Sequence, residues 1–562
     1  MIVWRSLPPL VGFLFVQLAV RVQATPPQQP APERSVLDIP DSVVIEGRAR
    51  YQLQTSGSKN FTYYAKAFPV ERQDDPHGFT SVATLPALSS KQTYPTPVRH
   101  GAIRATQVRA VAQHYGNVLA FGNRVADLRG WLVSGDGELG GGRGHTADAG
   151  WHCEALSGRV RKVISWRTAY EGQCAFESGR TGIWGQTTPS HRTYYRADMG
   201  LGVERVIGDD HQVRLDLDFA QRGVGGPEAD VGEQAFASRL TWQRASGRFW
   251  VRATGLADVV HTSRPSGKSG TGSHVVVSAE AWTRPEEDFG GALGVTVYTV
   301  DYFAGDSLRT IRPSIAAWAR ILDIVKFTAR LSSGVDRFGV WEAYRDNPLL
   351  NLATPVRTPF RSVDIDVNGE VPITHSHVAT FGMTHVVVKD YPVWVRKDTA
   401  TAWSERFPNE PFVRDQFAID YTYQGRETAS ITSFYGRYQH WWSGGSFNLF
   451  GVWRVHGLAG RDVPHVPGWE LHFVADLPLG RGIALSPGMH AIGKRRYVRR
   501  TALDSLDTLD PYVVFDVEAS VPLRQGWTFT ASVQNLLDQR YQIWEGFREP
   551  GLHVQVGLKR TW

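Results

Sequence analysis

The C-terminal segment, 552–562, constrains the fold of this chain more than any other part of it. Its alternate positions carry apolar side chains, namely Leu552, Val554, Val556, Leu558 and Trp562. The positions between them are mostly polar: His553, Gln555, Lys559 and Thr561. Successive side chains of a β-strand point to opposite faces, so this segment predicts a strand with one apolar and one polar face. Such a strand is typical of a transmembrane β-barrel, which has lipid outside and water inside.

Arg560 is the one position that breaks this pattern, because it falls on the apolar face. An arginine that faces lipid is costly at the membrane midplane and much less costly near the membrane surface, where its side chain reaches the headgroups. We therefore expect Arg560 to lie at the edge of the membrane.

The same period of two recurs along the chain in five further segments: 213–219, 325–331, 363–367, 417–423 and 513–521. Alternation of this kind predicts half-exposed strands and not helices. A large soluble β-sandwich or propeller is the alternative fold, but charged side chains at nearly every second position would be costly in its core. They are tolerated where their face lines a water-filled lumen. We therefore predict an all-β protein, a transmembrane antiparallel β-barrel.

The N-terminal segment, 1–24, has the features of a cleaved secretory signal peptide. A basic residue, Arg5, precedes an apolar run that begins at Leu10 and extends to Val20, and small residues near Ala24 close the segment. A single transmembrane anchor is the alternative, but the apolar run is too short for it. No later window is apolar enough for a spanning helix. We expect an exported protein whose mature chain starts directly after this segment.

The composition agrees with these predictions. The hydrophobic fraction of 42% is ordinary for a soluble protein, and a barrel hides its membrane signal because only alternate residues face lipid. The 19 Trp, 19 Tyr and 26 Phe suit the aromatic girdles at membrane interfaces. The net charge of +6 is small for 562 residues and gives no case for nucleic-acid binding.

The two cysteines, Cys153 and Cys174, are too few for a disulfide scaffold, although they could pair in principle. We expect a hairpin turn at 156–159, soon after Cys153 and well before Cys174. Such a turn would separate the two side chains in register. Two free thiols are therefore predicted.

Short and long connections alternate along the chain. The short ones are expected at 156–159, 207–210, 244–248, 285–288, 372–374, 479–482 and 522–526. The long ones are expected at 171–190, 262–273, 342–360, 389–414 and 495–511. Bacterial barrels have short periplasmic turns and long extracellular loops, so both ends of the barrel segment, 101–562, are predicted to be periplasmic. At roughly twenty residues for a strand and its connection, this length predicts about 22 strands. Twenty strands remain the alternative, because by this count the segment between 428 and 469 contains one strand too many for both ends of the barrel to lie on the same side.

The C-terminal region resembles the TonB-dependent receptors of the outer membrane. The resemblance rests on Asn535-Leu-Leu-Asp-Gln-Arg-Tyr541, on Glu549-Pro-Gly551 and on 554–562. In that family a similar motif ends the penultimate strand, a Pro-Gly pair opens the last strand, and the chain stops on an aromatic residue. The matching positions are Asn535, Asp538, Tyr541, Pro550, Gly551 and Trp562. Leu537 and Trp562 stand where the family usually has Phe.

The resemblance also implies an N-terminal plug domain that fills the barrel, preceded by a short box that docks the TonB protein. Residues 41–47 look like such a box, but a periplasmic segment or a stray strand is the favoured interpretation. The segment that follows is short and rich in proline. We therefore expect a Pro-rich periplasmic or lumenal segment at 25–100 and no complete plug, which makes dependence on TonB doubtful. Inward loops, this segment or a partner protein would then have to narrow the lumen.

Charged residues on the polar strand faces are the candidate lumen lining: Arg214, Asp216, Asp218, Lys326, Arg330, Asp364, Asp366, Asp420, Asp516 and Glu518. Charges in a pore select solutes by sign, but these are mixed, and the alternative is that they only hydrate and cross-link the wall. A basic cluster is expected at the edge of an outer loop, formed by Lys494, Arg495, Arg496, Arg499 and Arg500. It could hold lipopolysaccharide phosphates or an acidic ligand, or it could form a solvated loop.

The function that the resemblance implies is solute uptake or passage across the outer membrane. A non-conducting barrel that anchors partner proteins is the alternative. We expect no enzyme and no cofactor, because no nucleophile, base and acid stand at a suitable spacing. His375 and His377, with His385 farther along, lack a third ligand in closed geometry, so no metal site is predicted. The expected partners are outer-membrane lipid, lipopolysaccharide and a plugging or surface protein.

Overall fold

The computed structural model describes residues 103–561, except for 114–115, 127–130, 143–149, 166, 184–189, 209, 227–228, 247–248, 264–268, 284–288, 302–306, 322–324, 336–338, 348–349, 351, 353–355, 357, 375, 397–416, 421–427, 444, 499–505, 545–546 and 550. The chain divides into two compact units after residue 59, and every described residue belongs to the second. The expected signal peptide, box and Pro-rich segment therefore lie outside the described residues, as do Pro550 and Trp562. Among the described helices, none is long and apolar enough to cross a membrane.

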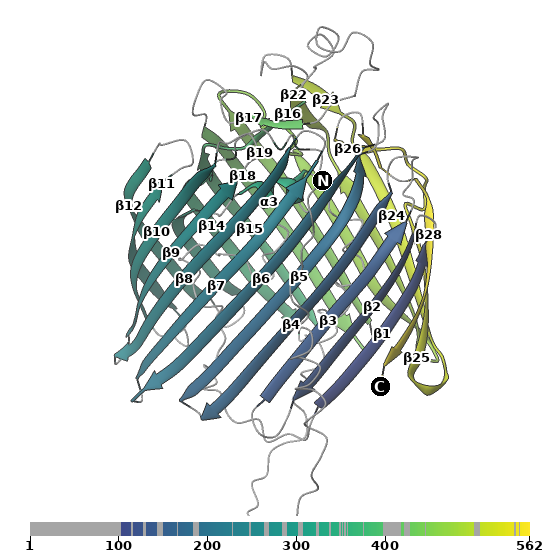
Figure 1. Ribbon diagram of the computed structural model, residues 1–562, viewed down its shortest axis with the longest axis horizontal. Coiled ribbons are helices and arrows are strands. Elements are labelled where there is room, and N and C mark those ends of the chain that lie inside the picture. The colour runs from purple at the N-terminus through teal and green to yellow at the C-terminus, as the bar shows by residue number, and fades with distance from the viewer. Residues whose placement is uncertain are drawn as a thin grey trace, which may run out of the picture. The chain divides into compact units, whose positions relative to one another are not determined.

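Twenty-two strands form one closed antiparallel sheet (Figure 1). Its first and last strands, β1 (Ile103–Gln113) and β28 (His553–Thr561), pair with one another, from Gln107 opposite Thr561 to Gln113 opposite Gln555. This pairing closes the cylinder, so the described sheet has no free edge in the membrane. The prediction of a barrel with about 22 strands is confirmed, and the alternative of 20 is excluded.

The other barrel strands follow one another around the cylinder. They are β2 (Gly116–Ala126), β3 (Trp131–Gly142), β4 (Trp151–Ser165), β5 (Thr168–Ile183), β6 (Ser190–Ile207), β7 (His211–Gly225), β8 (Asp230–Ser246), β9 (Phe249–Ser263), β10 (Gly270–Thr283), β11 (Phe289–Asp301), β12 (Ser307–Ile321), β13 (Val325–Val335), β14 (Phe360–Thr374), β15 (His377–Lys389), β18 (Thr428–Trp442), β19 (Gly445–Leu458), β20 (Trp469–Gly480), β21 (Ile483–Ile492), β24 (Tyr512–Pro522) and β25 (Trp527–Gln534). About ten residues suffice to cross the hydrocarbon. Strands as long as β6, with 18 residues, therefore extend beyond it.

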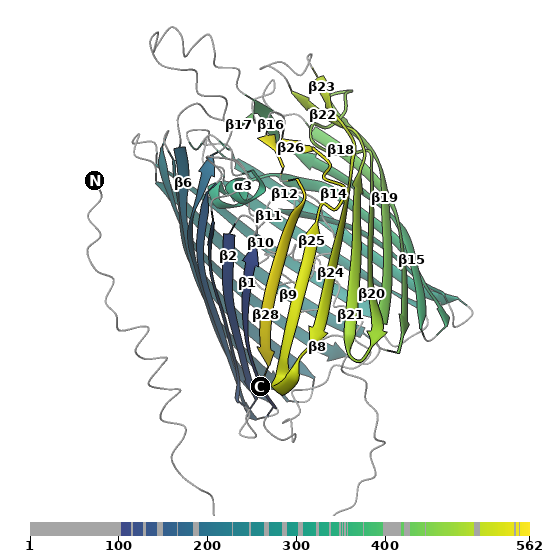
Figure 2. The same ribbon diagram turned by 90° about the vertical axis from the view of Figure 1, so that its right-hand side faces the viewer.

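The two ends of the cylinder differ in their connections. At one, the short-turn end, the connections are 127–130, 166–167, 208–210, 247–248, 284–288, 322–324, 375–376, 443–444, 481–482 and 523–526. At the other, the long-loop end, the longest connections are 336–359, 390–427, 459–468, 493–511 and 535–552. The labelled elements of these loops gather at one end of the barrel (Figure 2). Earlier connections at the long-loop end are short, so the predicted alternation holds only in the second half of the chain.

The long loops contain secondary structure of their own. Helix α3 (Val340–Asp346) lies in the connection between β13 and β14. Four short strands form a separate sheet: β16 (Val393–Arg396), β17 (Phe417–Asp420), β22 (Arg495–Val498) and β23 (Leu506–Leu509). Two more form a pair in the last loop, β26 (Gln542–Trp544) and β27 (Phe547–Arg548). A single 3₁₀ turn, η3 (Arg524–Gly526), occupies a connection at the short-turn end.

Two predicted connections are wrong, and a third, 372–374, is displaced, because it forms the end of β14 and the connection follows at 375–376. The segment 156–159 lies inside β4, and most of 171–190 belongs to β5. Ser and Gly at 157 and 158 give the first segment the composition of a turn. Leu156 nevertheless lies opposite residues of β3 and of β5, because strand pairing on both sides overrides that local preference.

The two cysteines are free, as predicted, although for a different reason. The turn between them lies at 166–167 and not at the expected 156–159. Cys153 on β4 lies opposite Gly179 of β5, and Cys174 on β5 lies opposite Gly158. The register of two adjacent strands therefore keeps the thiols apart.

The two faces of the wall differ as the alternation predicts. On β7, the large apolar side chains of Leu215 and Phe219 are 37% and 42% exposed. Arg222, on the opposite face, is buried and contacts Glu342 of α3. Helix α3 lies within the outline of the barrel in two perpendicular views (Figures 1 and 2). The face that carries Arg222 is therefore the lumen face, and the exposed apolar face is the outer one.

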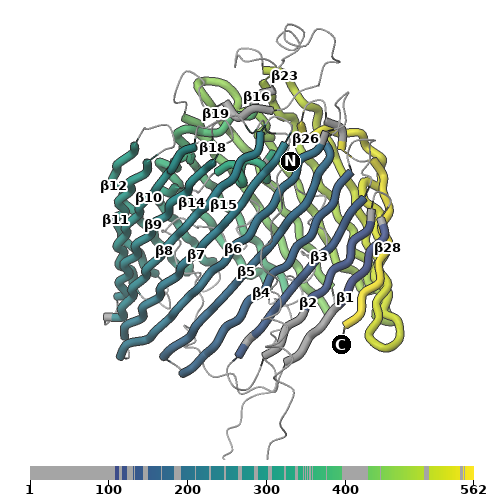
Figure 3. The backbone as a smooth tube through the Cα atoms, in the orientation of Figure 1, coloured from purple at the N-terminus to yellow at the C-terminus, as the bar shows by residue number. Residues whose placement is uncertain are grey.

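The C-terminal strand has the two faces predicted for it, and it lies beside β1 (Figure 3). Val554 and Val556 are 44% and 42% exposed, whereas His553 is buried. The guanidinium carbon of Arg560 lies 5.2 Å from the ring centre of Trp527. Since Trp527 directly follows a turn of the short-turn end, Arg560 lies near the end of the barrel.

Candidate functional site

The lumen face of β4 to β7 carries a ladder of paired charges. Arg159 donates a hydrogen bond to Glu171 at 2.6 Å. Arg214 contacts Asp216 at 2.9 Å and Glu204 at 3.8 Å. Arg214 and Asp216, two of the three predicted lining residues of β7, therefore lie on the lumen face and pair with charges of opposite sign. This arrangement leaves a hydrated wall with a small net field.

The second group of predicted lining residues also lies on one face of the wall. Lys326 and Arg330 occupy alternate positions of β13, and Asp364 and Asp366 occupy alternate positions of β14. Arg330 lies directly opposite Asp366. Asp364 accepts a hydrogen bond from Nη1 of Arg361 at 2.7 Å. Here too, positive and negative charges stand side by side.

The remaining predicted lining residues have different surroundings. Asp218 continues the lumen face of β7, and Asp516 and Glu518 share one face of β24. Asp516 accepts a hydrogen bond from the backbone N–H of Asn535 at 2.8 Å. Asp420 is a correction: it belongs to β17, which pairs with β16 in the loop sheet and not with the barrel. A short loop strand alternates in the same way as a barrel strand, and this misled the prediction.

Two residues of the receptor-like motif fix the path from β25 to β28. Asn535 has a left-handed backbone, with φ of 49°. Its side-chain amide donates to the carbonyl of Gln539 at 2.9 Å and accepts from the N–H of the same residue at 3.0 Å. Oδ1 of Asp538 accepts from the N–H of Leu552 at 2.9 Å, directly before the last strand. The motif therefore organises the loop that precedes the closing strand.

Gly551 and Tyr541 complete this structure. A Cβ atom at position 551 would lie 2.3 Å from Oδ1 of Asp538, so a side chain there would displace the carboxylate. The ring of Tyr541 stacks on that of Tyr512 with centroids 4.3 Å apart. Its carbonyl accepts a hydrogen bond from the N–H of Glu549 at 3.0 Å. These contacts join the last loop to the start of β24.

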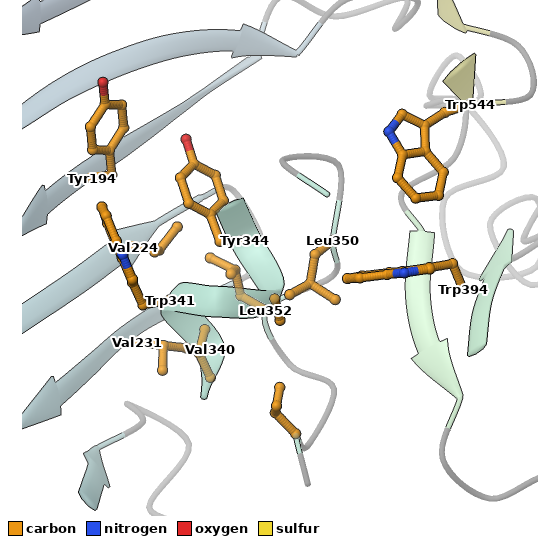
Figure 4. Packing of buried hydrophobic residues seen from close by; sticks show 12 residues of the cluster. Tyr194, Val224, Val231, Val340, Trp341, Tyr344, Leu350, Leu352, Trp394 and Trp544 are labelled. Atoms are coloured by element: carbon orange, nitrogen blue, oxygen red, sulfur yellow. The ribbon is translucent and has the colours of Figure 1, made fainter. Parts of the chain in front are cut away.

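A hydrophobic cluster at the long-loop end, which we call the mouth core, joins the wall to three loops (Figure 4). Its buried members are Tyr194, Val224, Val231, Val340, Trp341, Ala343, Tyr344, Leu350, Leu352, Val356, Trp394 and Trp544. The ring of Tyr194 on β6 lies 6.0 Å from Trp341 and 5.8 Å from Tyr344, both on α3. Because these wall residues are on the lumen face, α3 and the described residues Leu350, Leu352 and Val356 that follow it belong to a core on the inside of the barrel wall.

Two charged wall residues hold α3 in place. Glu233, which is 3% exposed, accepts hydrogen bonds from the N–H groups of Val340 at 2.8 Å and Trp341 at 3.0 Å. Amides in the first turn of a helix lack partners within the helix, so a carboxylate there stabilises it. Arg222 donates to Glu342 at 2.6 Å. A helix of 7 residues is not stable alone, so these contacts and the mouth core determine its structure.

The mouth core extends into two further loops through Trp394 and Trp544, whose rings meet edge to face at 5.7 Å. The imidazole of His465 packs on Trp544 with ring centres 4.6 Å apart. Burial lowers the pKa of His465 to about 3, and the charge of Arg495 contributes in the same direction. His465 is therefore neutral, as an apolar contact requires.

The predicted basic cluster divides into a buried and an exposed part. Arg495 is 2% exposed, and its guanidinium donates to two backbone carbonyls of β26 at 2.6 and 3.2 Å. Lys494 and Arg496 are exposed. Arg499 and Arg500 lie outside the described residues. An anionic ligand or lipopolysaccharide is therefore proposed only for the exposed residues, since Arg495 stabilises the loop.

The histidines singled out from the sequence do not come together in the part of the chain that the structure describes. His377 stacks on His440 of the neighbouring strand, with ring centroids 3.9 Å apart. His385 contacts Thr432 instead. His375 lies outside the described residues.

A different group does come together on the lumen face, and the sequence analysis did not find it. Glu470, His472 and His490 place one potential ligand atom each within 4.8 Å of the others. A signal for it exists in the sequence. Glu470 and His472 share a strand face, and a turn at 481–482 sets His490 opposite His472.

The fold is that of outer-membrane receptor and transporter barrels, as expected from the resemblance to TonB-dependent receptors. The copper transporter OprC has a TM-score of 0.63 at 11% identity, over 83% of this chain and 82% of that chain. The siderophore receptor PirA from Pseudomonas aeruginosa has a TM-score of 0.58 at 10% identity, over 82% and 80%. The FrpB iron transporter from Neisseria meningitidis has a TM-score of 0.61 at 8% identity, over 83% and 82%. At such identities the similarity establishes the fold. No family model matches the sequence, and no curated protein does.

Proposed function

We propose that the protein is an outer-membrane barrel for the uptake or passage of solutes, and that its mouth core controls entry. One observation carries this proposal: a loop with its own helix is folded onto the lumen wall and held there by buried contacts. A wall of 22 strands encloses a bore wide enough for solutes. The neighbours in fold include proteins described as transporters of copper and iron and as siderophore receptors, which supports uptake and a non-enzymatic role.

We further propose that the long-loop end faces the outside of the cell and that both ends of the barrel chain face the periplasm. Bacterial barrels place their short turns in the periplasm, which supports this orientation. It also puts the exposed Lys494 and Arg496 where lipopolysaccharide phosphates lie. The paired charges of the wall support a conduit with little preference for the sign of an ion.

Single-channel recording in planar bilayers tests the proposal. The wild-type chain is compared with a double variant, Trp341→Ser and Tyr344→Ser, in which α3 loses its two aromatic anchors to the wall. We expect the wild type to conduct rarely and the variant to open more often and to a higher conductance. The matched control is Leu479→Ser, which also removes an apolar side chain but lies 62% exposed at the short-turn end. It should record like the wild type.

Two outcomes contradict the proposal. If neither the wild type nor the double variant conducts, the barrel does not pass solutes, and a scaffold that anchors partners becomes the better account. If all three proteins conduct equally, the bore is open but the mouth core does not control it. Circular dichroism of each variant in detergent verifies that the β-barrel has formed before recording.

A further inference from the structure

Three potential metal ligands lie on the lumen face near the long-loop end. Glu470 and His472 occupy alternate positions at the start of β20, and His490 lies close to the end of β21. Both positions are next to loops of the long-loop end. Arg454 of β19, which contacts Glu470, completes the group.

Strand pairing places the two imidazoles together. His472 lies directly opposite His490, and their rings stack with centroids 4.2 Å apart. Nε2 of His472 is 3.3 Å from Oε2 of Glu470. The three potential ligand atoms lie within 4.8 Å of one another. Ligands at about 2.1 Å from one ion are up to about 4.2 Å apart, so small side-chain rotations would close the site.

The surroundings hold the carboxylate and leave one imidazole nitrogen without a partner. Glu470 is 2% exposed, and its Oε1 atom pairs with Arg454. Its other carboxylate oxygen, Oε2, is therefore directed to the histidines. Nε2 of His490 is buried and has no hydrogen-bond partner among the described residues. A buried polar atom without a partner costs stability unless a ligand satisfies it. The side chain of His472 is 28% exposed, so the group remains in contact with the lumen.

We propose that Glu470, His472 and His490 bind a divalent transition-metal ion of the Zn²⁺, Cu²⁺ or Ni²⁺ class. Imidazole nitrogen suits these ions, whereas Ca²⁺ and Mg²⁺ prefer sites made only of oxygen ligands. Three protein ligands leave at least one coordination position open, and here it faces the lumen. Arg454 is the second-layer residue that orients the carboxylate. The inference goes beyond solute passage and is independent of whether the barrel conducts.

The His377–His440 pair provides an internal comparison. It is also a stacked pair on neighbouring barrel strands, with centroids 3.9 Å apart. One nitrogen of each ring has a partner: Nδ1 of His377 lies 2.6 Å from the hydroxyl of Tyr438, and Nδ1 of His440 lies 3.2 Å from the carbonyl of Ser376. No carboxylate joins this pair in a potential metal group among the described residues. Stacking alone therefore does not account for the features of the Glu470 group.

Zinc binding to the full chain tests the proposal. Tag-free protein in detergent is stripped with EDTA and dialysed against micromolar ZnCl₂, and bound zinc is measured by atomic absorption. We expect one tightly bound Zn²⁺ that raises the melting temperature. The variants His490→Gln and His472→Gln should each weaken binding at least about tenfold and lose the thermal shift. His440→Gln is the matched control and should bind zinc like the wild type.

A spectroscopic measurement identifies the ligands. Co²⁺ in place of zinc should give visible absorption bands that are absent in the His490→Gln variant and retained in His440→Gln. The proposal is overturned if stripped wild-type protein binds no zinc tightly, or if the His472→Gln and His490→Gln variants bind it like the wild type. It is also overturned if His440→Gln loses as much binding as they do. Melting temperatures without metal verify that each variant is folded.

Discussion

Arg222 of β7 and Glu342 of α3 form an ion pair between the barrel wall and the helix on its inner side, with Nη1 and Oε1 2.6 Å apart. The two side chains are only 7% and 17% exposed. A second carboxylate, Asp198, lies 3.3 Å from Nε of the same arginine. One buried guanidinium therefore neutralises two acids from different parts of the chain.

Replacing Arg222 with methionine should detach α3 from the wall. Removing one partner of a buried ion pair costs about 3–5 kcal/mol, because the remaining charge stays buried. Hydrogen exchange of the amides at 340–346 should become much faster in the variant. Arg244→Met is the control, since Arg244 pairs with Asp210 on the surface, where both side chains are more than 40% exposed. Unchanged exchange in the Arg222 variant would refute the role assigned to this pair.

Trp544→Ala should loosen the loops that meet in the mouth core. The indole contacts both Trp394 and His465, and truncating a buried aromatic residue costs about 3–5 kcal/mol. Limited proteolysis should cleave the long loops faster in this variant. Trp453→Ala serves as the control, because Trp453 is 64% exposed on the outer face. Equal cleavage rates for both variants would argue against a shared core.

Glu549 should make the last loop more stable at acid pH than at alkaline pH. Burial raises the pKa of this carboxyl from 4.5 to about 8, while Arg495 opposes the shift. The folded loop thus binds the proton more tightly than the unfolded chain does. Its contribution to stability is complete below pH 4.5 and is lost as the pH rises through about 8. The fall in melting temperature between pH 6 and pH 9 should be smaller in Glu549→Gln than in the wild type, and an identical fall would contradict this assignment.

Asp538→Ala should weaken the start of the closing strand. The carboxylate accepts the N–H of Leu552 at 2.9 Å, and losing one such hydrogen bond costs about 1 kcal/mol. Asp538→Asn keeps an acceptor oxygen and should retain most of the stability. The two variants are compared by thermal melting in detergent. If they melt at the same temperature, this hydrogen bond does not stabilise the barrel.

Barrel strands were predictable from the sequence where one strand meets lipid and water on opposite faces over its whole length. Val554 and His553 on β28 illustrate this, since the first is exposed on the outer face and the second is buried. Composition misled the prediction where pairing decides, as at 156–159 within β4. The alternation pattern also gave a wrong prediction at Asp420, because a four-residue loop strand has too few positions to be distinguished from a barrel strand.

The functional residues were predictable only in part. Alternation placed Asp216 and Asp366 on the lumen face, but it could not reveal their partners. The Glu470 group was within reach, because the predicted turn at 479–482 is enough to set His472 near His490. The mouth core could not be predicted from the sequence, since its members extend from Tyr194 to Trp544 and depend on which loop folds inward.

The most direct test of the account is the chemical accessibility of two adjacent residues in the middle of β7. In a chain whose two cysteines are replaced by serine, Asp218→Cys and Phe219→Cys are compared in proteoliposomes with a charged, water-soluble maleimide. Asp218 is on the lumen face, and Phe219 is 42% exposed on the outer face, which contacts lipid in this account. We predict rapid labelling of the Asp218→Cys variant and almost none of Phe219→Cys. Equal labelling of both, or labelling of Phe219→Cys alone, would contradict a barrel with hydrocarbon outside and water within.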